Sequence, residues 1–259
     1  MRDHPWIFSG AVAGLRGAPG AGETIEVLSA SGEFLAWGAY SPNSQIRVRI
    51  WTRDPQQTID ADFFRQRLER SLAARGGLGL TGETDALRLV HGESDGLPGL
   101  IVDRYADTLV IQVLSSGVER WRDTLVGQLA ELTGIERVFE RSDVDVRRLE
   151  GLAERTGVLL GSEPTGRFTI HENGLRFWVD VRSGHKTGYY LDQRPNRARV
   201  GHLARGRQVL DCFCYTGGFS THALAGEADS VLAVDSSADA LALARENLAL
   251  NGLDAEKVT

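Results

Sequence analysis

The sequence predicts an α/β protein that begins with a small all-β barrel. Residues 1–55 consist of short runs in which apolar and polar side chains alternate, separated by glycine and proline. Residues 56–165 mix such runs with apolar side chains at helical spacing. Residues 166–259 contain a strand, a glycine turn, a helix and a second strand that ends in an acid. That order is typical of open, Rossmann-like sheets that bind nucleotides, so we expect three domains with these boundaries.

The residue pattern also locates elements within the first two domains. Glu23–Leu28 and Ile46–Trp51 alternate apolar with polar side chains, which predicts strands with one buried face. In the second domain, apolar residues at helical spacing predict helices over 59–74 and 118–132, the second ending near Gly134. The strands expected there cover 87–90, 99–103, 108–114 and 137–140.

In the third domain, Arg167–Asp180 is predicted to form a β-hairpin because an Asn-Gly dipeptide lies near its centre. Val209–Leu210 and Val231–Val234 are apolar runs that we expect to be strands. After the second run, Ser236–Asp239 can cap a helix, and Asn251-Gly252 is its stop signal.

Composition and length fit a globular protein and exclude several other classes. The chain has 259 residues, of which 42% are hydrophobic and 25% charged, which is ordinary for a folded protein. No apolar run approaches the roughly 20 residues that span a bilayer, and the start lacks the apolar centre of a signal peptide. We therefore expect a cytoplasmic protein. Cys212 and Cys214 are the only cysteines, and their spacing suits neither a disulfide framework nor a metal site.

The net charge of −6 hides a basic segment. The excess of acid lies entirely in residues 56–165, where 13 Arg face 19 acids. Arg182–Arg207 instead contains seven basic residues and a single acid, Asp192. Such a local field attracts phosphate, which makes the segment a candidate nucleic-acid surface. A solvated helix face with a chance imbalance of charge is the alternative.

The most informative motif is Asp211–Phe219, a glycine turn directly after an apolar strand. Gly217 and Gly218 lack a Cβ, so a ligand can approach the backbone at the start of the next helix. Asp235 ends the second strand, where it can accept hydrogen bonds from both hydroxyls of a ribose. The pattern is not G-x-G-x-x-G, and its aspartate and aromatic residues favour S-adenosylmethionine over a nicotinamide dinucleotide. Alternatively, the glycines only permit tight packing and Asp235 only caps the next helix.

A second segment that could bind ligands is Gly184–Arg197, which combines glycines, two tyrosines, an amide and cations. This set suits contact with an adenine ring, a carboxylate or RNA phosphate. Lys186 is notable because the chain has only one other lysine, Lys257. A need for a compact, flexible charge at this position is one explanation, and codon bias with one exception is the other.

Four segments together resemble the bacterial 23S ribosomal RNA large-subunit cytosine-5 methyltransferase I family. They are His4–Gly10, His91–Gly99, Gly184–Arg194 and Asp211–Phe219, they occur in the family's order, and the resemblance extends over essentially the whole chain. It implies an N-terminal PUA domain that binds RNA, a central α/β domain, and a class I methyltransferase domain that uses S-adenosylmethionine. It also suggests a homodimer.

The resemblance implies roles for individual residues. Asp235 would hold the cofactor ribose, and Arg47 and Arg49 make their strand a candidate RNA surface, although two arginines on a solvent face are more often merely solubilising. From the basic segment, Arg194 and Arg197 are candidate RNA contacts. The other implied cofactor-binding residues are Asp211, Phe213, Tyr215 and Gly217 in the turn, with Lys186, Tyr190 and Gln193 closing the pocket.

Methylation of cytosine at C5 requires a nucleophile that we expect outside this chain. Because C5 is a poor nucleophile, a cysteine thiolate must first add to C6, and a base must later remove the C5 proton. In the family, that cysteine and an Asp-Pro-Pro motif lie downstream of the position of Thr259. Two parallel strands also leave faces of a sheet uncovered. We therefore expect a fragment, inactive by itself, in which Cys212 and Cys214 are packed thiols.

The sequence thus predicts an S-adenosylmethionine-dependent RNA (cytosine-5) methyltransferase that acts on 23S ribosomal RNA, with no catalytic residue assigned within this chain. Two alternatives stay open: the same architecture with another RNA target, and an RNA-binding module without methyltransferase activity. A nicotinamide oxidoreductase is a more distant alternative.

Overall fold

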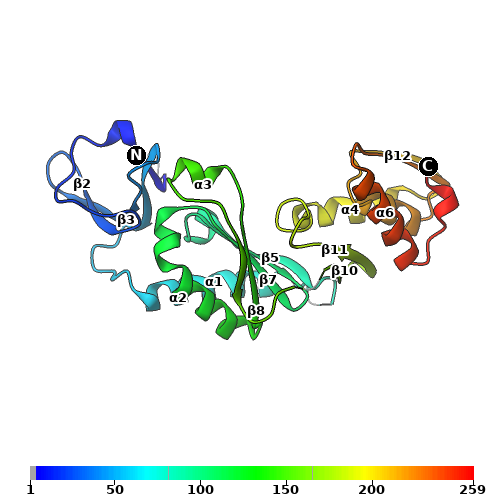
Figure 1. The fold of residues 1–259 in the computed structure, drawn as a ribbon, viewed down its shortest axis with the longest axis horizontal. Helices are drawn as coiled ribbons and strands as arrows, with labels where there is room; N and C mark the ends of the chain where they lie inside the picture. Colours follow the sequence, from blue (N-terminus) through cyan, green and yellow to red (C-terminus); the bar gives the residue numbers. More distant parts are fainter. Residues whose placement is uncertain (1–3, 81, 165) are drawn as a thin grey trace. The chain divides into compact units, whose positions relative to one another are not determined.

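The computed structural model describes residues 4–80, 82–164 and 166–259. Its chain divides into two compact units, whose elements are labelled in Figure 1. The N-terminal unit consists of Met1–Gly79 and Arg88–Pro164, and the C-terminal unit consists of Leu80–Leu87 and Thr165–Thr259. Within the described ranges, no helix is both long enough and apolar enough to span a membrane.

The N-terminal unit starts with an all-β module, as predicted. Its strands are ordered β1-β4-β3-β2, and neighbouring strands are antiparallel. The two strands expected from alternation are confirmed as β2 and β4. The bounds are β1 (Trp6–Phe8), β2 (Thr24–Leu28), β3 (Phe34–Tyr40) and β4 (Ile46–Thr52), with a 3₁₀ turn at Ser9–Ala11.

The rest of the N-terminal unit is a mixed sheet of five strands in the order β5-β6-β7-β8-β9. β7 and β8 are parallel, whereas β6 with β7 and β8 with β9 are antiparallel. The four strands expected here are confirmed, and β9 is an additional one. The bounds are β5 (Ala86–His91), β6 (Leu100–Tyr105), β7 (Thr108–Val113), β8 (Arg137–Ser142) and β9 (Arg155–Leu160), with a 3₁₀ turn at Gly92–Asp95.

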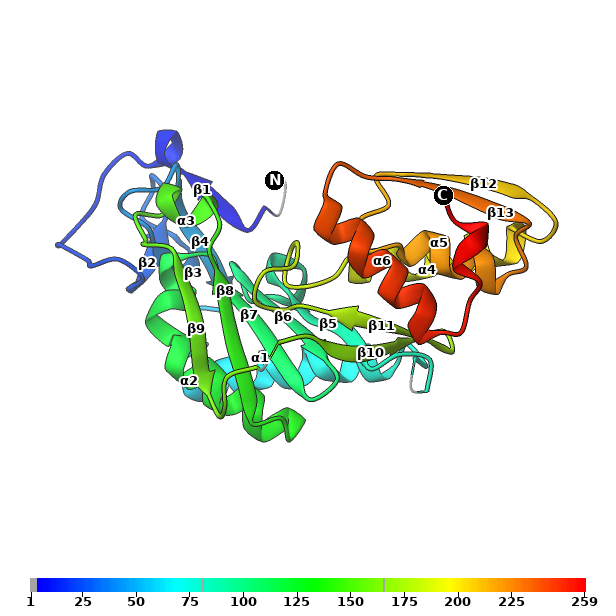
Figure 2. The same ribbon diagram turned by 45° about the vertical axis from the view of Figure 1, so that its right-hand side comes forward.

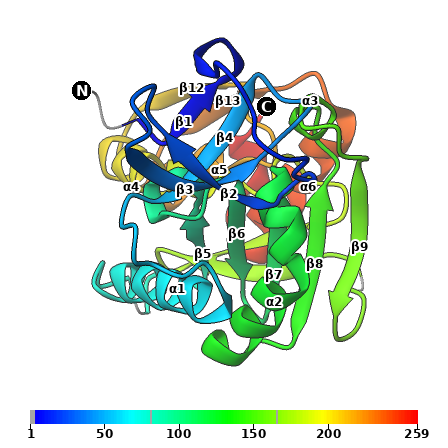
Figure 3. The ribbon, with the colours of Figure 1, turned by 90° about the vertical axis from the view of Figure 1, so that its left-hand side faces the viewer.

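Two long helices pack in this unit, and both begin at a side-chain cap. Asp60 accepts a hydrogen bond from the backbone N–H of Phe63 before α1 (Ala61–Gly76), and Ser115 caps α2 (Ser116–Thr133) in the same way. α2 ends at Gly134, whose φ of 68° is the left-handed conformation that glycine adopts without strain. α2 contacts β7 and β8, and α1 packs against α2 (Figure 3).

A buried ion pair joins the β-module to the five-stranded part of this unit. Glu150 accepts from the Arg49 guanidinium at 2.9 Å, from Ser41 Oγ at 2.8 Å and from the Ser116 N–H at 3.3 Å. Close packing accompanies this pair, because a Cβ added to Gly117 would lie 2.4 Å from the Ala39 Cβ. These contacts explain why both parts belong to one compact unit.

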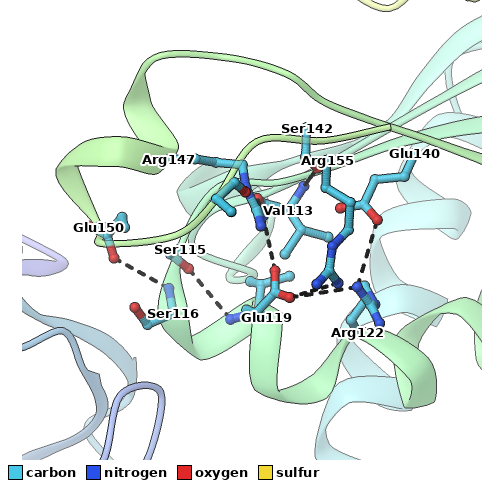
Figure 4. Close-up of polar contacts among 12 residues, drawn as sticks. Val113, Ser115, Ser116, Glu119, Arg122, Glu140, Ser142, Arg147, Glu150 and Arg155 are labelled. Atoms are coloured by element: carbon cyan, nitrogen blue, oxygen red, sulfur yellow. Dashed lines mark hydrogen bonds and ion pairs between the residues drawn. The ribbon is translucent and has the colours of Figure 1, made fainter. Parts of the chain in front are cut away.

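The short helix α3 (Val146–Leu149) is anchored by charge rather than by apolar packing (Figure 4). The buried guanidinium of Arg147 donates to the Val113 carbonyl at 2.5 Å, to Glu119 Oε2 at 2.9 Å and to the Ala153 carbonyl at 2.7 Å. Leu149, in contrast, is exposed. No apolar periodicity marks α3, so the sequence pattern did not predict it.

The C-terminal unit contains the predicted hairpin, in which β10 (Phe168–Glu172) pairs with β11 (Leu175–Val179). Its turn has positive φ at Asn173 (50°) and Gly174 (78°), as the Asn-Gly signal requires. A parallel pair of strands follows, formed by β12 (Gln208–Cys212) and β13 (Ser230–Val234). The helices are α4 (Arg194–Leu203), α5 (Gly218–Ala225) and α6 (Ala238–Leu250), with 3₁₀ turns at Leu191–Gln193 and Ala255–Lys257.

The three helices α4, α5 and α6 lie on one side of the β12–β13 pair (Figures 1 and 2). A core forms there that includes Ala223 of α5, Val231 of β13 and Leu248 of α6. On the other face, Leu210 is 62% exposed, and Leu232 and Val234 are about half exposed. Helix α6 begins at the cap Ser237 and ends at Asn251, as predicted.

We expect the N-terminal unit to be sensitive to the loss of one partner of the Arg49–Glu150 pair. Glu150→Gln should lower the free energy of unfolding by about 3 kcal/mol, because it leaves the Arg49 charge buried and uncompensated. Replacing both residues, as Arg49→Met with Glu150→Leu, should cost less than the single change. Urea denaturation measures the free energy of unfolding of the single and the double variant.

The exposed pair between Arg65 and Glu131 is the control, since its Glu131→Gln variant should unfold almost as the parent does. If Glu150→Gln and Glu131→Gln lower the free energy of unfolding equally, the buried pair does not join the two parts of the unit.

Candidate functional site

The glycine turn between β12 and α5 is held in a strained, left-handed conformation. Phe213, Tyr215 and Gly217 have φ values of 60°, 48° and 73°. Gly217 is required on two grounds, because a side chain there would be strained and its Cβ would lie 2.8 Å from the Ala244 Cβ of α6. The turn therefore carries two aromatic residues on a backbone that their side chains disfavour.

Asp211 fastens the turn to the start of α5. Its Oδ2 accepts from the Ser220 N–H at 3.1 Å and from Ser220 Oγ at 2.6 Å. Burial raises the pKa of the Asp211 carboxyl, and the two hydrogen bonds from Ser220 oppose that rise. Asp211 thus has a structural role at the base of the turn.

Asp235 lies directly after β13, level with the turn, because Val234 pairs with Cys212 in the parallel register. Its two oxygens accept backbone N–H bonds at 2.9 Å, one from Tyr215 and one from Ser237. These backbone hydrogen bonds lower the pKa of Asp235, so the group is a carboxylate at neutral pH. Each oxygen of a carboxylate has a further lone pair, which leaves acceptor capacity for a ligand.

The loop 184–190 places aromatic rings and a cation against the turn. The His185 ring stacks on the Tyr215 ring, with centroids 4.5 Å apart and planes 11° apart. The backbone N–H of His185 donates to Tyr215 Oη at 2.9 Å. Tyr190 meets Tyr215 edge-on at 5.5 Å, and Lys186 Nζ lies 5.9 Å from the centre of the Tyr190 ring. Lys186 itself has a φ of 59°.

The structure therefore brings together four of the predicted site residues: Lys186, Tyr190, Tyr215 and Asp235. His185, which the sequence reasoning did not single out, is the hub of the cluster. The sequence drew attention to the glycines and the lysine beside His185. The role of His185 in the cluster is visible from its stacking on Tyr215.

Two other predicted residues lie differently. Phe213 is 89% exposed. The Gln193 side chain bonds to Asp192 and Asn196 at the start of α4. Gln193 is linked to the cluster through its backbone N–H, which donates to the Tyr190 carbonyl at 3.2 Å.

The RNA role predicted for Arg197 does not fit its environment. The residue is 2% exposed, and its Nε and Nη2 atoms each lie 2.6 Å from an oxygen of Glu172. Binding phosphate there would leave the buried Glu172 carboxylate without its partner. Arg194, at the start of α4, is half-buried and stays a candidate.

The strand β4 likewise does not present both of its arginines to solvent. Arg49 is 6% exposed and is paired with Glu150, so its prediction as an RNA contact is wrong for the same physical reason. Arg47 is half-buried and donates to the backbone carbonyls of Ser41 and Pro42. The assignment of Arg47 to RNA stays a prediction.

The two cysteines differ. Cys214 is a packed thiol, as expected, and burial raises its pKa to about 11. Cys212 is exposed, so the expectation that it packs is wrong. A thiol with a raised pKa is protonated at neutral pH, which makes Cys214 a poor nucleophile.

Comparison with known families agrees with this geometry. Residues 2–53 match a model described as a PUA-like domain, and residues 147–259 match one described as an S-adenosylmethionine-dependent methyltransferase. The chain therefore combines a PUA-like domain with residues of an S-adenosylmethionine-dependent methyltransferase domain.

Curated relatives define the family more narrowly. Over 98% of its length the chain is 52% identical to the ribosomal RNA large subunit methyltransferase I of Shewanella denitrificans, and 51% identical to that of Aeromonas hydrophila. Over the part that it spans, the chain is therefore similar to proteins named ribosomal RNA large subunit methyltransferase I. The chain spans 64% of the length of each of these relatives.

A solved structure described as "A putative sam-dependent methyltransferase from Streptococcus mutans" has the same fold. It superposes with a TM-score of 0.83 at 24% identity, covering 98% of this chain and 65% of that one. The likeness supports the all-β module, the mixed sheet and the Rossmann-like part as one known architecture.

We expect Gly217→Ala to destabilise the C-terminal unit by more than the strain of its positive φ alone would. A positive φ costs an alanine about 1–2 kcal/mol, and the contact with Ala244 adds to it. Gly206→Ala is the matched control, because Gly206 has a φ of 64° with no heavy atom within 4 Å of the added Cβ. Thermal unfolding should rank Gly217→Ala well below Gly206→Ala, and equal melting temperatures would contradict the packing argument.

The pH dependence of stability should report on His222, which is buried and stacked on Phe177 with its Nδ1 atom 2.9 Å from the Gly218 carbonyl. Burial lowers its pKa from 6.5. The unfolded chain therefore binds more protons in the window below 6.5, so stability is lost as the pH falls through that window. His222→Gln should flatten the change in melting temperature between about pH 7 and 5, and an unchanged slope would exclude His222 as its source.

Proposed function

We propose that the whole protein, at the length of its relatives, methylates C5 of a cytosine in 23S ribosomal RNA, and that this chain holds its S-adenosylmethionine. The observation that carries the proposal is the placement of Asp235. It is ionised, it lies where β13 ends beside the turn, and it has acceptor capacity that fits the two ribose hydroxyls of an adenosine cofactor.

The other residues of the cluster fit the rest of such a cofactor. The rings of Tyr190 and Tyr215 offer apolar surface to an adenine, and Lys186 offers a cation to a carboxylate. α5 begins directly after the turn, and the partial positive charge at the start of a helix favours an anion. When bound, S-adenosylmethionine supplies the methyl group.

Cytosine as the target base rests on the family resemblance, and the attacking thiolate is assigned to neither cysteine of this chain. Cys214 is held protonated by burial. Cys212 is exposed beside Asp211 at the end of β12. We therefore assign cofactor binding to this chain and methyl transfer to the whole protein.

Calorimetric titration of this chain with S-adenosylmethionine tests the proposal. Asp235→Ala should weaken binding tenfold or more, because a hydrogen bond to a charged group contributes roughly 1.5–3 kcal/mol. Asp239→Ala, which removes the same charge in the first turn of α6, should bind as the parent does.

Equal affinity of the parent and Asp235→Ala would refute the role of Asp235. A folded chain that binds RNA and no S-adenosylmethionine would favour the RNA-binding module instead.

A further inference from the structure

Helix α6 packs against β11, the second strand of the hairpin (Figure 2). Among the described strands, β11 pairs with β10 alone, so the backbone groups on its other edge need partners from outside the hairpin. Two asparagines supply them. Asn251, at the end of α6, accepts from the Arg176 N–H at 2.8 Å and donates to the Arg176 carbonyl at 2.7 Å. Asn247 accepts from the Trp178 N–H at 2.8 Å.

The spacing of these residues explains why the helix fits the strand. Asn247 and Asn251 are one helical turn apart, which is a rise of about 6 Å. Arg176 and Trp178 are two strand residues apart, which is about 6.8 Å. The two asparagine side chains therefore take the place of a neighbouring strand along this edge of β11.

Asn247 makes one further bond, which distinguishes it from Asn251. Its Nδ2 donates at 2.9 Å to the carbonyl of Thr216, in the glycine turn. The other amide bond of Asn251 stays within α6, at the Asn247 carbonyl. Because the Trp178 N–H only donates and the Thr216 carbonyl only accepts, a single orientation of the Asn247 amide satisfies both. The residue is fully buried, so solvent does not readily replace either bond.

The bond to Thr216 connects the two segments that face a ligand. Thr216 directly follows Tyr215, whose N–H donates to Asp235. On the other side of Asn247, Trp178 is the last residue but one of β11, and the chain then continues to the loop 184–190. One buried amide thus reaches both the turn and the strand that leads into the loop.

We propose that Asn247 is a positioning residue of the cofactor site. By joining Thr216 to β11 it holds the turn, and with it the Tyr215 N–H, in one place relative to the strand that leads into the loop. The same face of α6 supports the turn at Ala244, three residues earlier, which would lie 2.8 Å from a Cβ added to Gly217. The inference rests on the proposed function, and Asn247 acts through Thr216 without touching the cofactor.

Asn247→Leu and Asn251→Leu are a matched pair for the test. Leucine has nearly the shape of asparagine and makes no hydrogen bond, so each change removes bonds between α6 and β11. Only Asn247→Leu also leaves the Thr216 carbonyl without its partner. Calorimetric titration should show S-adenosylmethionine bound about tenfold more weakly by Asn247→Leu and equally well by Asn251→Leu, while the melting temperature falls in both.

Asn247→Asp is the second variant, should Asn247→Leu fail to fold. In its ionised form the introduced side chain still accepts from the Trp178 N–H but cannot donate to the Thr216 carbonyl. It should therefore weaken binding of S-adenosylmethionine as well.

Amide hydrogen exchange gives a second measurement that needs no cofactor. The Tyr215 N–H should exchange faster in Asn247→Leu than in the parent, because the turn is no longer joined to β11. It should exchange at the parent rate in Asn251→Leu, although that variant is also destabilised, so a general loss of stability would not produce the difference.

Equal affinities of Asn247→Leu and Asn251→Leu for S-adenosylmethionine would overturn the positioning role and leave the proposed function standing. Equal exchange of the Tyr215 N–H in the two variants would overturn it too. If the parent chain binds no S-adenosylmethionine, the proposed function fails, and the exchange of the Tyr215 N–H alone decides whether Asn247 holds the turn.

Discussion

The candidate site depends on the buried ion pair between Arg197 and Glu172. The Arg197 guanidinium makes two hydrogen bonds of 2.6 Å to Glu172 of β10. It also donates to the Tyr190 carbonyl at 3.0 Å, so it joins β10 to the loop before α4. It also lies 4.5 Å from the centre of the Tyr189 ring. Because burial of an ion pair is costly unless its hydrogen bonds are made, this geometry favours the observed arrangement of the loop that contains His185 and Lys186. Gly218 leaves the necessary room, since a Cβ there would lie 3.0 Å from Arg197 Cδ.

With the loop held in this way, the site can tolerate local strain. Lys186, Phe213 and Tyr215 all have positive φ, and each such residue costs about 1–3 kcal/mol. Within the described part of the chain, only three other non-glycine residues share that conformation, so the strain is concentrated at this site. Two hydrogen bonds offset the strain at Tyr215. Its backbone N–H donates to Asp235, and its Oη accepts from the backbone N–H of His185. The same bonds that offset the strain orient the groups facing a ligand.

Much of this architecture could be predicted from the sequence, because local signals and tertiary structure agree. The alternation of apolar and polar side chains predicted β2 and β4, and the Asn-Gly pair predicted the hairpin. The apolar run before Asp235 predicted that this acid lies at the end of a strand. The prediction failed where a side chain's environment depends on distant residues. Nothing near Arg49 in sequence indicates Glu150, and nothing near Arg197 indicates Glu172, so both cations were assigned to solvent. His185 was missed because its partner lies 30 residues away, across the turn.

These pairings reduce the positive charge that is available to an anionic ligand. The basic segment 182–207 has an excess of six positive charges by count, seven basic residues against one acid. Arg197 is neutralised in the core and Arg205 lies 2.6 Å from Glu227, so the field that reaches solvent is smaller than the sequence suggests. In the N-terminal unit, Arg49 is likewise buried and paired. A cation that is already paired with a carboxylate is less able to attract phosphate.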